Sequence, residues 1–257
     1  MAVDATYDSI GIGYSRFRQP DPRVEAQILA PLGGARRVLN VGAGSGSYEP
    51  TDRVVVAVEP SERMIEQRPS TASRIVVRAV AGDLPFEDDT FDAAMALMTV
   101  HHWPDIWAGL AEVRRVTSGP VVVFHYDTAV HAQQWLVTDY LPSMVELDAG
   151  VPSPTAVAEA LGGGEVTVVP VPHDCHDGFC HAFWRRPEAY LDPTVRASIS
   201  GIARSPARVV DEAMARLADD LASGRWQRRH ADLLTAEEID AGYRLVVAPT
   251  TKPPSRS

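Results

Sequence analysis

Short apolar runs alternate with helical segments through the first half of the chain. The runs are rich in valine, alanine and leucine and lack a period of two, which is typical of parallel strands buried on both faces. They predict strands at 37–41, 54–58, 75–77, 91–97 and 121–124. Capping residues and helical spacing of apolar positions predict helices over 21–32, 61–68 and 104–116. This alternation predicts an α/β fold with a doubly wound sheet.

The pattern changes after residue 127. Two more apolar runs, at 166–171 and 243–248, predict a sixth and a seventh strand. The 71 residues between them are mostly helical in pattern and include an amphipathic stretch over 207–221. Further helices are predicted over 130–148, with a break near Pro142, and over 154–161.

The first predicted strand runs directly into a glycine-rich loop. Gly42, Gly44 and Gly46 stand at alternate positions, and glycine permits positive φ and a close approach of backbone N–H groups to a ligand. The second strand ends at Glu59, 17 residues after Gly42, where a carboxylate can accept hydrogen bonds from both hydroxyls of a ribose. The loop and the acid together predict a nucleotide site. Pro50 limits the helix between the two strands to a turn or two.

Four segments in this order resemble the class I S-adenosylmethionine-dependent methyltransferases, in the small-molecule group that includes the ubiquinone and menaquinone methyltransferases. They are Val38 to Gly46, Val55 to Ser61, Leu84 to Asp92, and His101-His102-Trp103 followed by Arg115-Val116 and the fifth strand. The resemblance implies a Rossmann-like, seven-stranded sheet with an antiparallel last strand. It also implies a helical lid lobe inserted between strands 6 and 7.

This resemblance divides the chain into parts with separate tasks. We expect a cofactor-binding core over 1–127 with an N-terminal flap over 1–20, lid helices over 128–162, the last two strands within 163–171 and 242–249, a helical substrate lobe over 172–241, and a disordered tail over 250–257.

The resemblance also implies which residues bind the cofactor, S-adenosylmethionine. They are Tyr14, Gly42, Ala43, Gly44, Glu59, Pro60, Met64, Ala81, Asp83, Leu97 and Met98. Glu59 would hold the ribose hydroxyls, and the arm that carries Tyr14, with Arg16 or Arg18, would close over the sulfonium. The family's adenine-binding acid is displaced by one position here, to Asp83, so the backbone N–H of Ala81 is the alternative contact.

Composition and charge limit the classes of molecule that the protein is expected to bind. The net charge of −10 argues against nucleic acid, which is bound by clustered Lys and Arg. The chain shows no apolar stretch of membrane-spanning length and no signal peptide. Two cysteines suggest no disulfide framework. We therefore expect a cytoplasmic enzyme that acts on a small-molecule methyl acceptor, as a monomer or a homodimer.

Methyl transfer to oxygen or nitrogen is helped by a base that removes the acceptor's proton. His102 follows the fourth strand and His125 ends the fifth, so both are candidates. Residues 173–181 hold three His, two Asp and two Cys, and we interpret them as a pocket rim with Asp174, His176 or His181 as acid or base. Their spacing matches no structural zinc pattern, so we predict no metal.

The predicted function is transfer of the methyl group of S-adenosylmethionine to an O, N or C nucleophile, on a specialised metabolite. Two alternatives stay open at this stage. The chain could bind the cofactor while catalysing a rearrangement without methylation, or serve as a binding module. Cys175 and Cys180 could instead bind arsenite or another soft metal through their thiols.

Overall fold

A seven-stranded sheet forms the centre of the molecule. The computed structural model describes residues 18–250. The strand order is β3-β2-β1-β4-β5-β9-β6, and β9 runs antiparallel to both of its neighbours while the first five are parallel. The strands are β1 (Arg37–Val41), β2 (Val54–Val58), β3 (Val76–Val77), β4 (Ala93–Leu97), β5 (Val121–Tyr126), β6 (Glu165–Val168) and β9 (Tyr243–Ala248). This order confirms the predicted Rossmann-like sheet with an antiparallel last strand.

Apolar side chains cover both faces of this sheet, as the uninterrupted apolar runs require. On one face α3 (Pro22–Leu29), followed by η1 (Ala30–Leu32), packs Val24 and Ile28 against β1, β4 and β5. On the other face α5 (Ile106–Arg115) and α8 (Pro154–Ala160) complete a second core. Asp21, Asp105 and Ser153 cap these helices through their side chains.

The segment between β1 and β2 contains no helix, which corrects the prediction of one or two turns there. Backbone φ is positive at Gly42, Gly44 and Gly46 and also at Tyr48, and a right-handed helix needs negative φ at every residue. The next helix is α4 (Glu62–Glu66), which begins after β2 and is capped by Ser61. The loop itself therefore shapes this end of the sheet.

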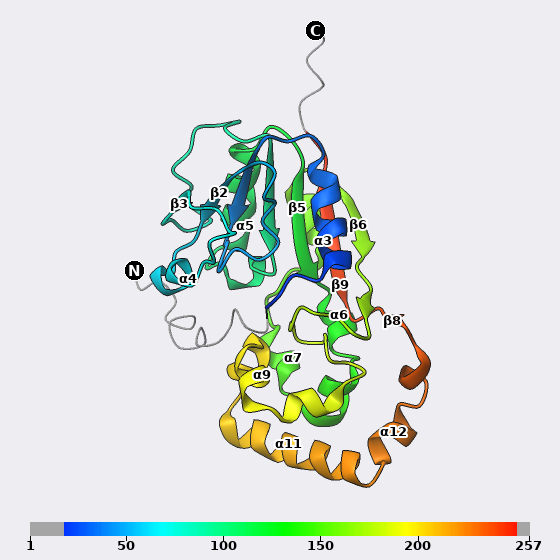
Figure 1. Ribbon diagram of the computed structural model, residues 1–257. Coiled ribbons are helices and arrows are strands. Elements are labelled where there is room, and N and C mark those ends of the chain that lie inside the picture. The colour runs from blue at the N-terminus through cyan, green and yellow to red at the C-terminus, as the bar shows by residue number, and fades with distance from the viewer. Residues whose placement is uncertain (1–17, 251–257) are drawn as a thin grey trace.

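A helical layer lies below the sheet in the view of Figure 1. Much of it comes from the chain between β6 and β9, and its helices pack around a separate apolar core that contains Trp135, Tyr190, Leu217 and Trp226. Its elements are η4 (Pro187–Leu191), α9 (Pro193–Ala197), α10 (Ser200–Ala203), α11 (Ala207–Ala222), α12 (Arg225–Arg229) and η5 (Leu233–Thr235). This stretch of chain also forms a small two-stranded sheet, β7 (Val171–Pro172) with β8 (Glu238–Ile239).

The chain after β5 adds three short helical pieces to this layer. They are α6 (Thr128–His131), a π-helical turn η3 (Leu136–Tyr140) and α7 (Met144–Leu147), and Pro142 separates the last two. The two remaining short elements of the core are β3 and η2 (Val100–His102), which follows β4. Among the described residues, no helix is both long enough and apolar enough to cross a membrane.

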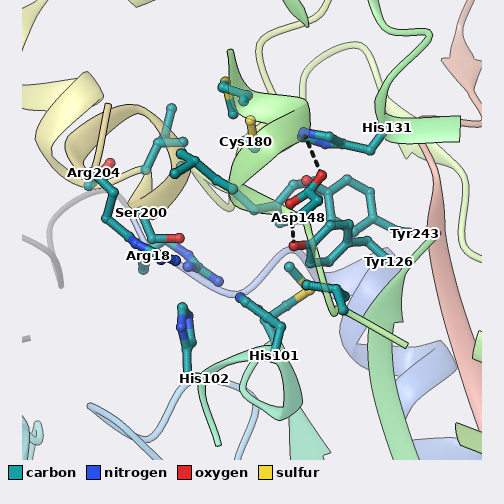
Figure 2. A pocket seen from close by; sticks show the side chains of 18 residues that line it. Arg18, His101, His102, Tyr126, His131, Asp148, Cys180, Ser200, Arg204 and Tyr243 are labelled. Atoms are coloured by element: carbon teal, nitrogen blue, oxygen red, sulfur yellow. Dashed lines mark hydrogen bonds and ion pairs between the residues drawn. The ribbon is translucent and has the colours of Figure 1, made fainter. Parts of the chain in front are cut away.

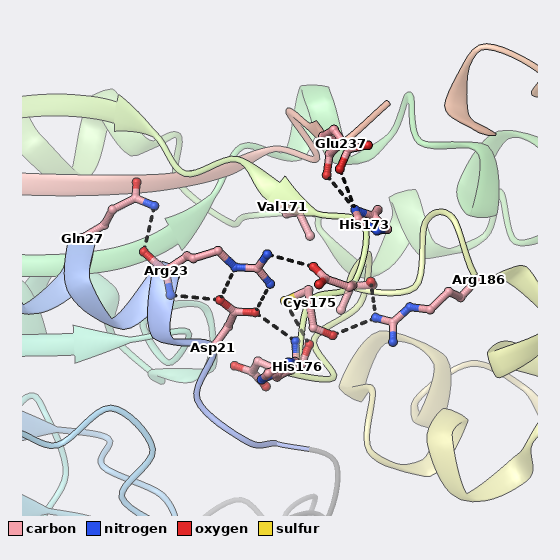
Figure 3. A network of polar contacts seen from close by, with 12 residues as sticks. Asp21, Arg23, Gln27, Val171, His173, Cys175, His176, Arg186 and Glu237 are labelled. Atoms are coloured by element: carbon pink, nitrogen blue, oxygen red, sulfur yellow. Dashed lines mark hydrogen bonds and ion pairs between the residues drawn. The ribbon is translucent and has the colours of Figure 1, made fainter. Parts of the chain in front are cut away.

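A polar network joins the start of α3 to the loop after β7 (Figure 3). The fully buried Asp21 carboxylate accepts hydrogen bonds from the Arg23 side chain, at 2.7 and 2.9 Å, and from the His176 N–H at 3.0 Å. Arg23 also reaches Asp174 at 2.8 Å. Burial alone would raise the pKa of Asp21, but the hydrogen bonds from Arg23 and His176 outweigh it and hold the pKa below its usual value.

Leu217→Ala should destabilise the helical layer. The Leu217 side chain is completely buried in the layer's own core, so its truncation should lower the free energy of unfolding by about 2–5 kcal/mol. Urea denaturation measures the loss, and hydrogen exchange should locate it in α9 to α12. Arg208→Ala on the exposed face of the same helix is the control, and an equal loss there would contradict the packing argument.

Asp21→Asn should cost stability in a pH-dependent way. The folded-state pKa is depressed, so the carboxylate stabilises the protein above its unfolded pKa of about 3.9, and this contribution is lost as the pH falls below that value. We expect the variant to be less stable by about 1–3 kcal/mol at pH 7, and the difference to shrink toward pH 3. Asp174→Asn, at the exposed end of the same network, should have little effect at either pH.

Candidate active site

The glycine loop packs directly against the end of β4. A Cβ atom at Gly42 would lie 2.0 Å from Thr99 Oγ1, and its φ is +68°, so only glycine fits there. Its N–H and that of Ala43 both bond to the carbonyl of Val58 on β2, at 2.9 and 3.0 Å. The loop is therefore fixed between the carboxyl ends of β2 and β4, where open α/β sheets bind their ligands.

Glu59 lies at the tip of β2 and faces this loop. Its carboxylate accepts hydrogen bonds from the N–H groups of Gly44 at 2.8 Å and Ser61 at 2.9 Å. Burial raises the pKa of this carboxyl, and the two N–H groups act in the opposite direction. Each oxygen accepts one backbone hydrogen bond and keeps a lone pair, so the arrangement fits a ligand diol. At Gly44 a Cβ would meet only the end of Met64 within 4 Å.

A buried ion pair supports the far side of the loop. The Arg68 guanidinium lies 2.6 Å from Glu49, and both side chains are at most 5% exposed. Arg68 also donates to the carbonyl of Gly44 at 3.0 Å, while Glu49 accepts from Asn40 on β1 at 2.9 Å. These contacts hold the loop on the side that faces Arg68 and Glu49 and leave its other side for a ligand.

A pocket opens next to the loop, at the carboxyl ends of β4 and β5 (Figure 2). Its volume is about 80 Å³, which is room for several water molecules. The sheet edge contributes Met98, His101, His102, Tyr126 and Tyr243, the segment after β5 contributes His131, Met144 and Asp148, and the insertion contributes Phe179, Cys180, Ser200 and Arg204. The pocket thus lies between the sheet and the helical layer.

The lining is cationic although the whole chain is acidic. Among the described residues it holds two guanidinium groups, Arg18 and Arg204, and one carboxylate, Asp148. Burial lowers the pKa of His101, His131 and His181, and neighbouring histidines or arginines add to this at His101 and His181. These histidines are therefore neutral at pH 7, and the arginines carry the positive charge.

One buried carboxylate ties three segments together at the pocket wall. Asp177, in the insertion, is completely buried and lies 2.6 Å from the Arg18 guanidinium. It also accepts a hydrogen bond of 2.8 Å from the Tyr48 hydroxyl, which follows the glycine loop. Arg18 is thereby held with its guanidinium at the pocket.

The residues predicted to bind the cofactor lie around this edge, apart from Tyr14, which falls outside the described residues. Met98, with φ of +51°, lines the pocket, and its N–H bonds to Phe124 at 2.7 Å. Leu97 precedes it on β4, and Pro60 and Met64 follow Glu59. Ala81 is buried, whereas Asp83 is exposed in a turn after β3.

Of the five predicted acid or base residues, only His102 lines the pocket. His125 is completely buried, and its Nε2 lies 2.9 Å from the carbonyl of Pro152, so it joins β5 to the segment before α8. Asp174 and His176 lie away from the pocket in the network around Asp21, because Arg23 pairs with Asp174 and the backbone N–H of His176 donates to Asp21. Their predicted place on a pocket rim is therefore wrong.

Three polar residues of the pocket wall were not among the predicted site residues. They are Tyr126, His131 and Asp148. Cys180, considered above as a thiol ligand, lines the same pocket, and the ligand-type atoms of His131, Cys180 and His181 all lie within 4.8 Å of one another. Tyr126 ends the fifth strand, whereas His131 and Asp148 belong to no motif and reach the pocket through tertiary packing.

The comparisons with known proteins agree with this geometry. Residues 39–122 match the family described as a methyltransferase domain. The chain is 32% identical to 27-O-demethylrifamycin SV methyltransferase of Amycolatopsis mediterranei, over 34% of this chain and 37% of that protein. It is 34% identical to demethylmenaquinone methyltransferase of Clavibacter sepedonicus, over 49% of this chain and 58% of that protein. The chain thus spans less than two thirds of these relatives.

A solved structure covers nearly the whole fold. It is a putative methyltransferase from an antibiotic biosynthesis pathway of Anabaena variabilis, with 29% identity and a TM-score of 0.83 over 90% of this chain and 98% of that one. Methyltransferases of this family take their methyl group from S-adenosylmethionine, and the glycine loop with Glu59 fits that group. In its sheet order, its glycine loop and these relatives, the chain is similar to the class I S-adenosylmethionine-dependent methyltransferases.

Proposed function

We propose that this protein transfers the methyl group of S-adenosylmethionine to a small molecule bound in the pocket between the sheet and the helical layer. The observation that carries the proposal is that one segment of the chain borders both the glycine loop and the pocket. The segment that runs from Met98 to His102 lines the pocket, and Thr99 within it contacts the glycine loop. A ligand on the loop and a ligand in the pocket therefore meet at the end of β4.

The chain's own task in such a reaction is alignment and exclusion of water. When bound, S-adenosylmethionine supplies a methyl group on a sulfonium that is already a good leaving group. Effective catalysis then depends on holding the acceptor in line with that group. The helical layer closes the pocket on the side opposite the sheet, and Arg18, held by Asp177, lines it.

We propose the following cofactor contacts. Glu59 accepts hydrogen bonds from the ribose hydroxyls, and Gly42, Ala43 and Gly44 line the ribose and methionyl portion. Pro60, Met64, Ala81 and Asp83 lie at the adenine end, Leu97 and Met98 at the methionyl end, and Tyr14 belongs to the arm that covers the sulfonium.

The pocket lining indicates a mostly apolar acceptor with a polar or anionic group. Met144, Ile199 and Phe179 supply apolar contacts, and Arg204 supplies a positive charge. The influence of Arg204 reaches across the pocket, because it contributes to lowering the pKa of His101. A specialised metabolite fits this description, and two of the similar proteins are named for antibiotic chemistry.

Release of S-adenosylhomocysteine tests the activity. The purified chain, incubated with methyl-labelled S-adenosylmethionine and a metabolite extract, should release S-adenosylhomocysteine and yield a product heavier by one labelled methyl group. Mass spectrometry detects both products. Product formation without S-adenosylhomocysteine would favour a rearrangement instead. Tight binding of NAD with no binding of S-adenosylmethionine would contradict the proposal.

Glu59→Gln should weaken cofactor binding. The substitution removes a charged acceptor, and hydrogen bonds to charged groups are worth about 1.5–3 kcal/mol, so S-adenosylhomocysteine should bind about 10- to 100-fold more weakly in a calorimetric titration. Glu62→Gln, three residues along and paired only with Arg78 in the open, is the matched control. Equal affinities for the Glu59 variant and the wild type would refute the assigned role.

A further inference from the structure

A chain of four polar side chains begins at the pocket wall and has no role in the reaction described so far. Figure 2 shows three of them, Tyr126, Asp148 and His131. The Tyr126 hydroxyl donates to Asp148 Oδ1 at 2.8 Å. The other carboxylate oxygen, Asp148 Oδ2, lies 3.6 Å from His131 Nε2. The second ring nitrogen of His131, Nδ1, is 2.7 Å from His181 Nε2. The four residues come from β5, α6, the end of α7 and the insertion.

The two histidines form a hydrogen-bonded pair. A tetrahedral zinc ion with Zn–N bonds of about 2.0–2.1 Å holds its nitrogen ligands about 3.3 Å apart. The His131 and His181 nitrogens are only 2.7 Å apart, so one shared proton joins them and no ion fits between them. Cys180 beside them is a buried thiol whose pKa burial raises, which also disfavours the thiolate that a metal binds.

This pairing fixes the tautomer of His131. A carboxylate only accepts, so the Nε2 that faces Asp148 is best protonated. His131 Nδ1 must then accept, and His181 donates to it through Nε2–H. The His131 ring is thereby locked with its N–H toward Asp148. This N–H points toward the carboxylate but remains too distant to form a hydrogen bond.

Asp148 Oδ2 is left without a hydrogen-bond donor. The atom is buried, and in the part of the chain that the structure describes it has no hydrogen-bond partner. The whole side chain is 13% exposed, and it lines the pocket. An unsatisfied buried acceptor is costly, more so when it is charged. A ligand in the pocket that offers an O–H or N–H group would remove this cost.

We propose that Asp148 Oδ2 binds the hydroxyl or amine hydrogen of the methyl acceptor and takes its proton. This assigns the acceptor to the O–H and N–H nucleophiles, with Tyr126 and the His131–His181 pair as positioning residues, and it rests on the proposed function. The lone pair of the acceptor oxygen or nitrogen forms the new bond to the methyl carbon. The carbon–sulfur bond breaks with its electrons left on sulfur, and the acceptor proton moves to Asp148 and then to solvent.

The assignment favours Asp148 over His102 as proton acceptor. His102 stacks on His101 with ring centroids 3.9 Å apart. Asp148 accepts a hydrogen bond from Tyr126, faces His131, and keeps one carboxylate oxygen without a donor among the described residues. The positive Arg204 across the pocket also helps an acceptor lose its proton.

Phenol and its methyl ether, anisole, test the donor requirement. Both probes have the same ring, but only phenol has an O–H group. With the wild-type protein saturated with S-adenosylhomocysteine, phenol should bind at least about tenfold more tightly than anisole in a ligand-observed NMR titration, since a hydrogen bond to a charged group is worth about 1.5–3 kcal/mol. Asp148→Asn should weaken phenol binding about tenfold and leave anisole binding unchanged.

The control is Asp139→Asn, which removes a carboxylate of similar burial that pairs with Arg229 outside the pocket; it should keep the preference for phenol. Equal binding of the two probes to the wild type would overturn the proposal, even if the Asp148 variant fails to fold. Unchanged phenol binding in a folded Asp148 variant would also overturn it. Binding of S-adenosylhomocysteine to the same samples is measured first. If S-adenosylhomocysteine does not bind, the proposed function is refuted. The titration with phenol and anisole on the cofactor-free protein would then test the Asp148 proposal by itself.

Discussion

The buried contact between Asp177 and its two donors is the constraint on which the pocket depends. Arg18 comes from the chain before α3, Tyr48 from the glycine loop and Asp177 from the insertion. These segments are far apart in the sequence, and each contributes to a different wall. Breaking a buried ion pair by removing one partner typically costs about 3–5 kcal/mol. The fold therefore links the cofactor loop to the acceptor side through a single carboxylate.

The sheet was predictable because its signal is local. Each core strand is an apolar run, and the glycine loop with Glu59 follows two of them at the expected spacing. The prediction of a helix between β1 and β2 was wrong because positive φ at three glycines and Tyr48 replaces helix with turns. Twelve residues suffice to connect parallel strands without one when the backbone turns this tightly.

The acceptor side was far less predictable because its contacts are tertiary. Asp174 and His176 looked like rim residues in the sequence, but Arg23 and Asp21, about 150 positions earlier, hold them elsewhere. Asp148 and His131 belong to no motif and meet only because α6 and α7 fold over the end of β5. Whether a polar side chain is buried depends on the folded structure, and no pattern in the sequence predicts it at these positions.

The position of β9 has a consequence for how this enzyme can diversify. Strands β6 and β9 are hydrogen-bonded neighbours, so the insertion leaves the sheet and returns to it at adjacent sites. Doubling the length of a flexible loop with fixed ends adds only about 0.6 kcal/mol of closure entropy. The insertion can therefore grow, shrink or be exchanged while the parallel strands stay unchanged, and the part of the pocket wall that it supplies would change with it.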